Sequence, residues 1–160
     1  MTEVEKLAHF VTDARFEWLS ERAREDLKAR VLDSIGCAIG ALRAGPIAAV
    51  RSLLPAADGS CTLIGVGHGS PEHATLYNGA LVRYLDFMDI YMAKRHSGHP
   101  SDNFAPVLAA AELMGRSGRE LLTALAVAYQ VQARLLDEAP VESEGFDHTV
   151  QLAYSVAAGV

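Results

Sequence analysis

The chain has 160 residues, of which 50% are apolar and only 21% are charged. This length fits one domain rather than two, and the apolar share excludes an intrinsically disordered protein. The net charge is −6 and the basic residues are scattered, so nucleic acid is not an expected partner. No apolar run reaches the roughly 20 residues that span a bilayer, so we expect no membrane segment.

The sequence offers no pattern typical of a bound metal or cofactor. His96, His99 and His148 lack the spacing of common zinc sites, and the glycines of residues 65–69 lack the Lys-Ser/Thr of a phosphate loop. Cys37 and Cys61 lie in apolar surroundings without a CxxC spacing. We therefore expect no metal, no cofactor and two reduced core cysteines. The first 20 residues also lack a secretory signal, and the expected location is cytoplasmic.

Alanine, leucine and glutamate dominate the periodic segments, which predicts a mainly α-helical chain. A short amphipathic helix is expected over residues 2–12. Ser20 is a good N-cap for a second helix, whose apolar residues recur every three or four positions between Leu27 and Leu42. Gly45 and Pro46 end that helix, and the proline can begin another short one.

A small β element is expected to interrupt the helices near residues 61–65. Residues 56–60 have the composition of a turn, and Cys61–Gly65 is the best strand candidate. Ser70 then has the properties of an N-cap for a helix that runs toward Phe87.

The second half of the chain alternates helices with two polar loops. Residues 88–101 break every helical period, and loops of this length are commonly functional. Helices are expected over about 102–114 and, capped by Ser117, to about 138. A loop over 140–146 precedes a last apolar segment that runs to Val160. This segment is expected to be helical and has no helix stop signal in its last turn. We expect one bundle-like helical domain over residues 1–160 and consider that the chain is truncated.

Two carboxylates stand at the end of the helix expected before the first polar loop. Asp86 and Asp89 are three residues apart and share a face if the helix continues through them. The helix dipole disfavours acids at this end, so each carboxylate needs a partner. Arg83 is the partner expected for Asp86. Asp89 has no local partner, which makes it a candidate functional residue.

Two loop-to-helix junctions carry histidines. His99 precedes Ser101, Asp102 and Asn103, where the free N–H groups of a helix start can receive a carboxylate oxygen. A histidine there can transfer a proton near neutral pH. His148 stands at the second junction. His99 could equally be a structural loop residue, and a lone histidine at a cap, such as His148, is more often structural. Sequence spacing does not decide whether the two junctions meet in one cleft.

Six short motifs occur in a fixed order along the chain. They are Asp33–Ala38 (DSIGCA), Asn78–Leu81 (NGAL), Leu85–Asp89 (LDFMD), His99–Asn103 (HPSDN), Ser117–Leu122 (SGRELL) and Phe146–Thr149 (FDHT). In this order they resemble the MmgE/PrpD family, which includes 2-methylcitrate dehydratase, cis-aconitate decarboxylase and an iminodisuccinate epimerase. The resemblance covers essentially the whole chain.

The resemblance implies a helical domain followed by a smaller lid domain, usually in a homodimer. It implies that Asp89, His99 and His148 are catalytic, and that Ser101, Asp102 and Asn103 bind the substrate. Met88 and Ile90 depart from the family, which usually has polar residues beside the aspartate. This chain corresponds to about the first third of such an enzyme, so the lid would be absent.

The leading hypothesis is a metal-independent hydro-lyase that dehydrates a 2-methylcitrate-like hydroxy-tricarboxylate in propionate metabolism. Decarboxylation or epimerisation of a related di- or tricarboxylate on the same scaffold is the enzymatic alternative. A third hypothesis, of a different class, is a non-catalytic helical module that dimerises or binds a separately encoded second half. The apolar excess of the chain favours this last hypothesis.

Overall fold

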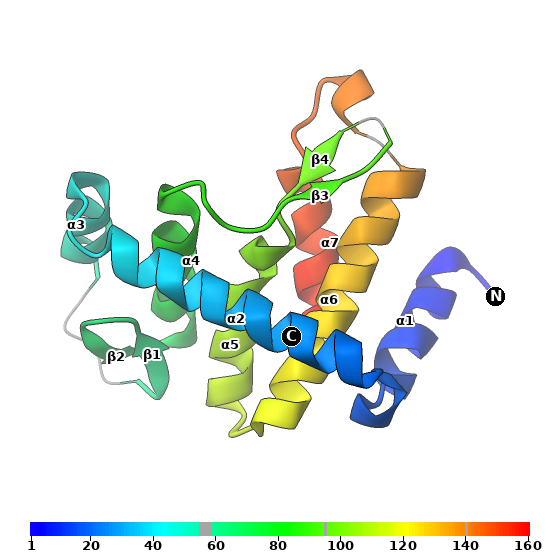
Figure 1. The fold of residues 1–160 in the computed structure, drawn as a ribbon, viewed down its shortest axis with the longest axis horizontal. Coiled ribbons are helices and arrows are strands. Elements are labelled where there is room, and N and C mark those ends of the chain that lie inside the picture. The colour runs from blue at the N-terminus through cyan, green and yellow to red at the C-terminus, as the bar shows by residue number, and fades with distance from the viewer. Residues whose placement is uncertain (55–58, 95, 140) are drawn as a thin grey trace.

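The computed structural model describes residues 1–54, 59–94, 96–139 and 141–160. Within these ranges the chain is mainly helical (Figure 1), which confirms the expected fold class. The α-helices are α1 (Glu3–Asp13), α2 (Glu21–Ala41), α3 (Gly45–Ser52), α4 (Pro71–Tyr84), α5 (Phe104–Leu113), α6 (Gly118–Glu138) and α7 (Thr149–Gly159). Short 3-10 helices are η1 (Phe16–Trp18), η2 (Pro100–Asn103) and η3 (Glu142–Glu144). The strands are β1 (Cys61–Leu63), β2 (Gly67–Gly69), β3 (Tyr91–Met92) and β4 (Ser97–Gly98).

Four helices begin at hydroxyl side chains that accept hydrogen bonds from the first turn. Thr2 caps α1, Ser20 caps α2, Ser70 caps α4 and Ser117 caps α6. At α1 and α6 the third helical residue is a glutamate that bonds back to the cap, which completes a capping box. The three predicted serine caps are thereby confirmed.

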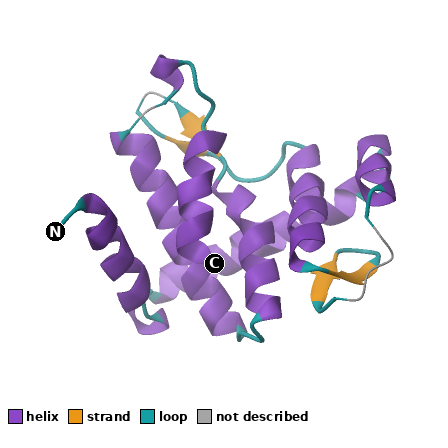
Figure 2. Cartoon of the chain, turned by 180° about the vertical axis from the view of Figure 1, so that it is seen from behind, coloured by secondary structure: helices purple, strands orange, loops and turns teal. Residues whose placement is uncertain are grey.

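The core lies where α2 crosses the upright helices α4, α5 and α6, and α7 packs against α6 (Figures 1 and 2). Its largest fully buried apolar side chains are Tyr77, Phe104, Leu81, Leu125 and Leu136. Cys37 and Cys61 are both buried free thiols, as expected. Helix α1, in contrast, contributes no fully buried residue.

The expected β element is present and is one strand of a hairpin. β1 pairs antiparallel with β2, which contains Gly67 and Gly69 of the glycine-rich residues 65–69. Glu112 of α5 accepts hydrogen bonds from the Thr62 amide at 2.7 Å and the Thr62 hydroxyl at 2.5 Å. Asn78 of α4 bonds to the backbone of Thr62 and Ile64. Two helices therefore hold the hairpin from one side. Of the predicted turn 56–60, residues 56–58 lie outside the described residues.

The prediction of a loop throughout residues 88–101 was wrong in part. β3 and β4 form a second small hairpin, closed by a hydrogen bond from the Ala93 amide to the His96 carbonyl. The Tyr91 hydroxyl donates to Asp137 of α6 at 2.8 Å. Strand pairing of only two residues gives no period in the sequence, so the pattern could not indicate it.

Helix α4 ends at Tyr84, before the two carboxylates, and Asp86 adopts a left-handed conformation with φ of 55°. Asp86 and Asp89 consequently do not share a helical face. Residues 100–103 form η2 rather than the first turn of α5. No single helix in the described ranges is long and apolar enough to cross a membrane; α2 and α3 pass by length and composition only as a pair, bent by 91°.

Candidate functional site

The segment between α4 and α5 is organised around Asp89. The Asp89 carboxylate accepts a hydrogen bond from the Ser101 amide at 2.9 Å, and its side chain is only 5% exposed. The main-chain carbonyl of Asp89 lies 2.8 Å from Nδ1 of His99. A carbonyl only accepts, so Nδ1 carries the proton and Nε2 keeps its lone pair. Asp89 thus fixes both the start of η2 and the tautomer of His99.

Helices α2 and α6 supply two groups near Asp89 that sequence reasoning missed. Arg30 Nε of α2 lies 4.0 Å from the carboxylate of Asp89. Burial and the neighbouring Asp89 carboxylate raise the pKa of Tyr129, a residue of α6. Both residues stand far from Asp89 in the sequence and interrupt no helical period. No local signal could have indicated them.

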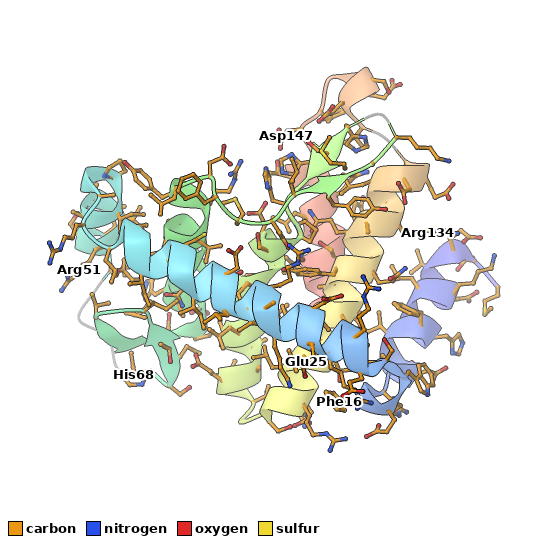
Figure 3. All side chains as sticks on the ribbon, in the orientation of Figure 1. Phe16, Glu25, Arg51, His68, Arg134 and Asp147 are labelled. Carbon is orange, nitrogen blue, oxygen red and sulfur yellow. The ribbon has the colours of Figure 1, made fainter. Side chains whose placement is uncertain are left out.

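The two histidine-bearing junctions meet in space. The rings of His99 and His148 are 5.6 Å apart between centroids and cross at 64°. His148 Nε2 lies 3.8 Å from a carboxylate oxygen of Asp102, and its Nδ1 lies 3.3 Å from Asp147. Figure 3 shows Asp147 at the end of the molecule that carries β3 and β4. One histidine ring therefore offers a lone pair while the other faces two carboxylates.

Of the two acids beside His148, Asp102 is the more buried, with a side chain 11% exposed against 65% for Asp147. Burial raises the pKa of its carboxyl, and Arg83, His99 and His148 lower it in part. The nearby Asp89 carboxylate adds to the increase. A buried carboxyl with a raised pKa beside histidines is typical of functional sites, although structural networks produce it as well.

Ser101 and Asn103 lie deeper in the fold. Asn103 Nδ2 donates to Gln132 at 2.6 Å and to the Pro100 carbonyl at 2.9 Å, while its Oδ1 accepts from Ser155 at 2.8 Å. These bonds join η2 to α6 and α7. The Ser101 hydroxyl is buried and has no hydrogen-bond partner among the described residues.

A pocket of about 250 Å³ opens beside Asp102. It is lined by Gly79, Val82, Arg83, Ser101, Asp102, Thr149 and Leu152. Arg83 is the one cationic side chain of this lining, and it pairs with Asp86 as the sequence predicts. The pocket therefore combines one cation, the polar residue Thr149 and an apolar wall next to the carboxyl that faces His148.

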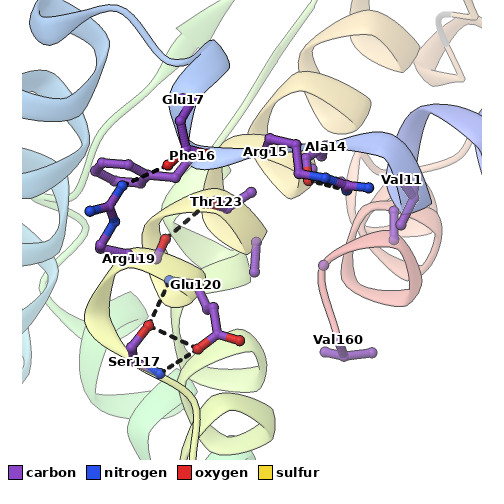
Figure 4. Close-up of a pocket in the computed structure, with 14 residues that line it drawn as sticks. Val11, Ala14, Arg15, Phe16, Glu17, Ser117, Arg119, Glu120, Thr123 and Val160 are labelled. Carbon is purple, nitrogen blue, oxygen red and sulfur yellow. Dashed lines mark hydrogen bonds and ion pairs between the residues drawn. The ribbon is translucent and has the colours of Figure 1, made fainter.

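A larger pocket of about 470 Å³ lies at the other end of α6 (Figure 4). Arg119 stacks 4.3 Å from the Phe16 ring and pairs with Glu17 at 2.7 Å, and Ser117 bonds Glu120 in the capping box. Figure 4 shows these polar groups directed at one another. The contacts of Arg119 hold η1 against α6, and neither His99 nor His148 lines this pocket.

No three histidine, cysteine, aspartate or glutamate side chains converge as a metal site in the part of the chain that the structure describes. The chemistry that the described residues offer at the site is acid–base: two histidines, two buried aspartates and one arginine.

The chain is similar in sequence to one described protein family and to several dehydratases. A family model described as the MmgE/PrpD N-terminal domain matches residues 5–160. The 2-methylcitrate dehydratases of Escherichia coli (strain K12) and Cupriavidus necator are 30% and 31% identical over 152 residues. An alkylcitrate dehydratase of a fungal species is 35% identical over 158 residues.

These matches cover most of this chain but a smaller part of each relative. They include 84%, 85% and 83% of the chain, respectively. They include only 31%, 31% and 30% of the relatives' lengths. The chain therefore spans about a third of the length of the curated relatives that it matches.

Proposed function

Because the chain belongs to the MmgE/PrpD family, we propose that it carries acid–base residues of a hydro-lyase acting on an alkylcitrate-type tricarboxylate. The names of its relatives, 2-methylcitrate dehydratase and alkylcitrate dehydratase, support this reaction class. The observation that carries the proposal is the pairing of His99 with His148 across two separate loop-to-helix junctions.

In the proposed reaction His99 is the base. Its Nδ1 proton is held by the Asp89 carbonyl, so Nε2 is the atom that can accept a proton. It takes the proton from the carbon next to a substrate carboxylate, and the electrons of that C–H bond form the new C=C bond. The C–O bond at the adjacent carbon breaks at the same time or afterwards.

His148 is the proposed acid. In its protonated form both ring nitrogens carry protons and face the carboxylates of Asp102 and Asp147. It gives one proton to the departing hydroxide, which leaves as water. The substrate thereby loses one proton and one hydroxide, and solvent returns the two histidines to their starting states.

The three residues after His99 and Pro100 are proposed to serve substrate binding in different ways. Asp102 lines the pocket and can contact a bound acid directly, whereas Ser101 lines it with its hydroxyl buried and supports the wall of the pocket. Asn103 has its amide engaged by Gln132, Ser155 and the backbone, so it acts by holding η2 in place. Asp89 likewise acts as a positioning residue, through Ser101 and His99.

Several finer expectations stay predictions. They are independence from metal, a cytoplasmic location, a place in propionate metabolism, and assembly as a homodimer or with a separately encoded second half. A helical module without catalytic activity would retain the fold described above and lack turnover, so the experiment below separates it from the hydro-lyase.

The test is proton NMR of the purified protein that carries this chain, incubated with 2-methylcitrate. We expect olefinic signals to appear, and His99→Ala to lower their rate of appearance by about 100-fold or more, because a general base contributes that much. His68→Ala is the matched control, since His68 is exposed on β2 at a distance from Asp147 (Figure 3).

Three outcomes would contradict the proposal. They are an unchanged rate in His99→Ala, the release of carbon dioxide or an epimer in place of an alkene, and the absence of any product from folded protein. The second outcome would support the decarboxylase or epimerase alternative, and the third would support the non-catalytic module.

A further inference from the structure

We propose that Arg83, held in place by Asp86, binds one carboxylate of the substrate at the pocket beside Asp102. This inference rests on the proposed function, because it identifies the acid-binding group of the same site. The sequence predicted only that Arg83 forms an ion pair with Asp86.

Arg83 has the donors that such a contact requires. It stands in the last turn of α4 and lines the pocket together with Ser101, Asp102 and Thr149. Its Nη1 donates to Asp86 and lies 3.5 Å from the sulfur of Met88. Nε and Nη2 donate to no group among the described residues. These two nitrogens form the edge of a guanidinium that matches a carboxylate in a two-bond arrangement.

The backbone at Asp86 explains how the guanidinium is oriented. Asp86 has a φ of 55°, the one positive value found at a residue other than glycine in the described ranges. This left-handed residue turns the chain directly after α4 and brings its carboxylate back onto Arg83. An unusual backbone conformation next to a pocket is a feature from which a functional role can be argued. Here it fixes a flexible side chain before ligand binds, which lowers the entropic cost of binding.

The surroundings of Arg83 suit a carboxylate with an aliphatic arm. Val82 and Leu152 supply an apolar wall, whereas Thr149 adds a polar residue. Asp102 is the one acid in the lining, and burial raises the pKa of its carboxyl. A carboxyl that protonates more readily repels an incoming anion less. Arg83 then supplies the attraction that selects an acid over a neutral ligand of the same shape.

The experiment is calorimetric titration of the purified protein with propane-1,2,3-tricarboxylate, which has no hydroxyl group to eliminate. Arg83→Gln removes the charge, and we expect the dissociation constant to rise by about tenfold or more, as for loss of a hydrogen bond to a charged group. Arg83→Lys keeps the charge without the two-bond edge, so its dissociation constant should lie between those of the wild type and Arg83→Gln. Asp86→Asn should weaken binding by a few-fold.

Arg116→Gln is the matched control. Arg116 resembles Arg83 in its surroundings, because it is 53% exposed and pairs with Glu120 at 3.3 Å, whereas Arg83 is 43% exposed and pairs with Asp86. Arg116 does not line this pocket. Its substitution should leave the dissociation constant unchanged. Circular dichroism of each variant verifies that the helices are intact.

Three results would overturn the proposal. They are wild-type affinity in a folded Arg83→Gln variant, an equal loss of affinity in Arg83→Gln and Arg116→Gln, and no binding of propane-1,2,3-tricarboxylate to the wild-type protein. Wild-type affinity in Asp86→Asn would overturn the part assigned to Asp86. The titration needs no turnover, so its result and that of the dehydration assay are separate. Binding through Arg83 without alkene formation would contradict the proposed function alone, and alkene formation with a dispensable Arg83 would contradict this inference alone.

Discussion

At the scale of single residues, Asp102 and Asp147 flank His148 but differ in environment. Burial raises the pKa of Asp102, whereas hydrogen bonds from the backbone and side chain of Thr149 lower the pKa of Asp147. Ionisation of the Asp102 carboxyl therefore destabilises the folded state, whereas ionisation of the Asp147 carboxyl stabilises it. The two acids should therefore affect stability in opposite directions as the pH changes.

This difference gives a prediction for Asp102→Asn. The folded pKa of Asp102 lies above its unfolded value, so the folded state binds the extra proton and stability falls as the pH rises through that interval. We expect Asp102→Asn to unfold at higher denaturant concentration than the wild type at pH 7, with the difference vanishing below the unfolded pKa. Chemical denaturation at pH 3 and pH 7 measures it.

Asp147→Asn is the matched control and should behave in the opposite way. The folded pKa of Asp147 is depressed, so its stabilising effect is present above the unfolded value and is lost as the pH falls through the folded value. A loss of stability in Asp102→Asn at pH 7 would show that its ion pairs outweigh its burial.

A second prediction at this scale concerns Asn103. It is fully buried, and its amide joins Gln132, Ser155 and the Pro100 carbonyl in one network. Asn103→Ala leaves the buried amide oxygen of Gln132 without its donor and breaks the links to Ser155 and Pro100, so we expect a loss of about 2–4 kcal/mol in the free energy of unfolding. Urea denaturation measures the loss. Ser52→Ala removes an exposed hydrogen bond and should change stability by less than about 0.5 kcal/mol; similar effects of the two substitutions would refute the importance of the network.

At the scale of elements, α1 and α6 begin with the same capping box but differ in what they bury. Helix α6 contains six buried residues, five of them apolar, and α1 contains none. Identical local chemistry should therefore have different consequences for the stability of the whole molecule. Packing of an amphipathic face supplies most helical stability in proteins, and the cap adds to it.

The corresponding prediction compares Ser117→Ala with Thr2→Ala. Loss of the Ser117 cap should lower the free energy of global unfolding by about 1 kcal/mol, because α6 unfolds with the core. Loss of the Thr2 cap should fray α1 while the global midpoint changes little. Thermal denaturation followed by circular dichroism gives both midpoints, and equal shifts would contradict the view that α1 is peripheral.

The same elements show why parts of the fold were predictable. The helix starts at Ser20, Ser70 and Ser117 were predictable because an N-cap is a local interaction. Its side chain bonds to a backbone amide only three residues further along the chain. Pairing of β3 with β4 involves two residues on each side, too few to give a period. The end of α4 was misplaced because the apolar pattern continues past Tyr84, while the left-handed Asp86 stops the helix.

At the scale of the whole molecule, the site is assembled from segments that are remote in sequence. His99 and His148 are 49 positions apart in the numbering, yet their rings lie 5.6 Å apart because α6 and α7 pack antiparallel beside η2. Residue type and the family resemblance indicated both histidines. Their meeting, the approach of Arg30 and the pocket beside Arg83 depend on tertiary packing, which no local pattern encodes.

The hydrogen bond between the Asp89 carbonyl and His99 has a consequence for how this protein can vary. The acceptor belongs to the peptide backbone, so no substitution of the side chain at position 89 deletes it. Evolution can exchange the carboxylate that holds Ser101 while the imidazole still points its lone pair the same way. The orientation of the base is therefore inherited with the path of the main chain rather than with the identity of a neighbouring residue.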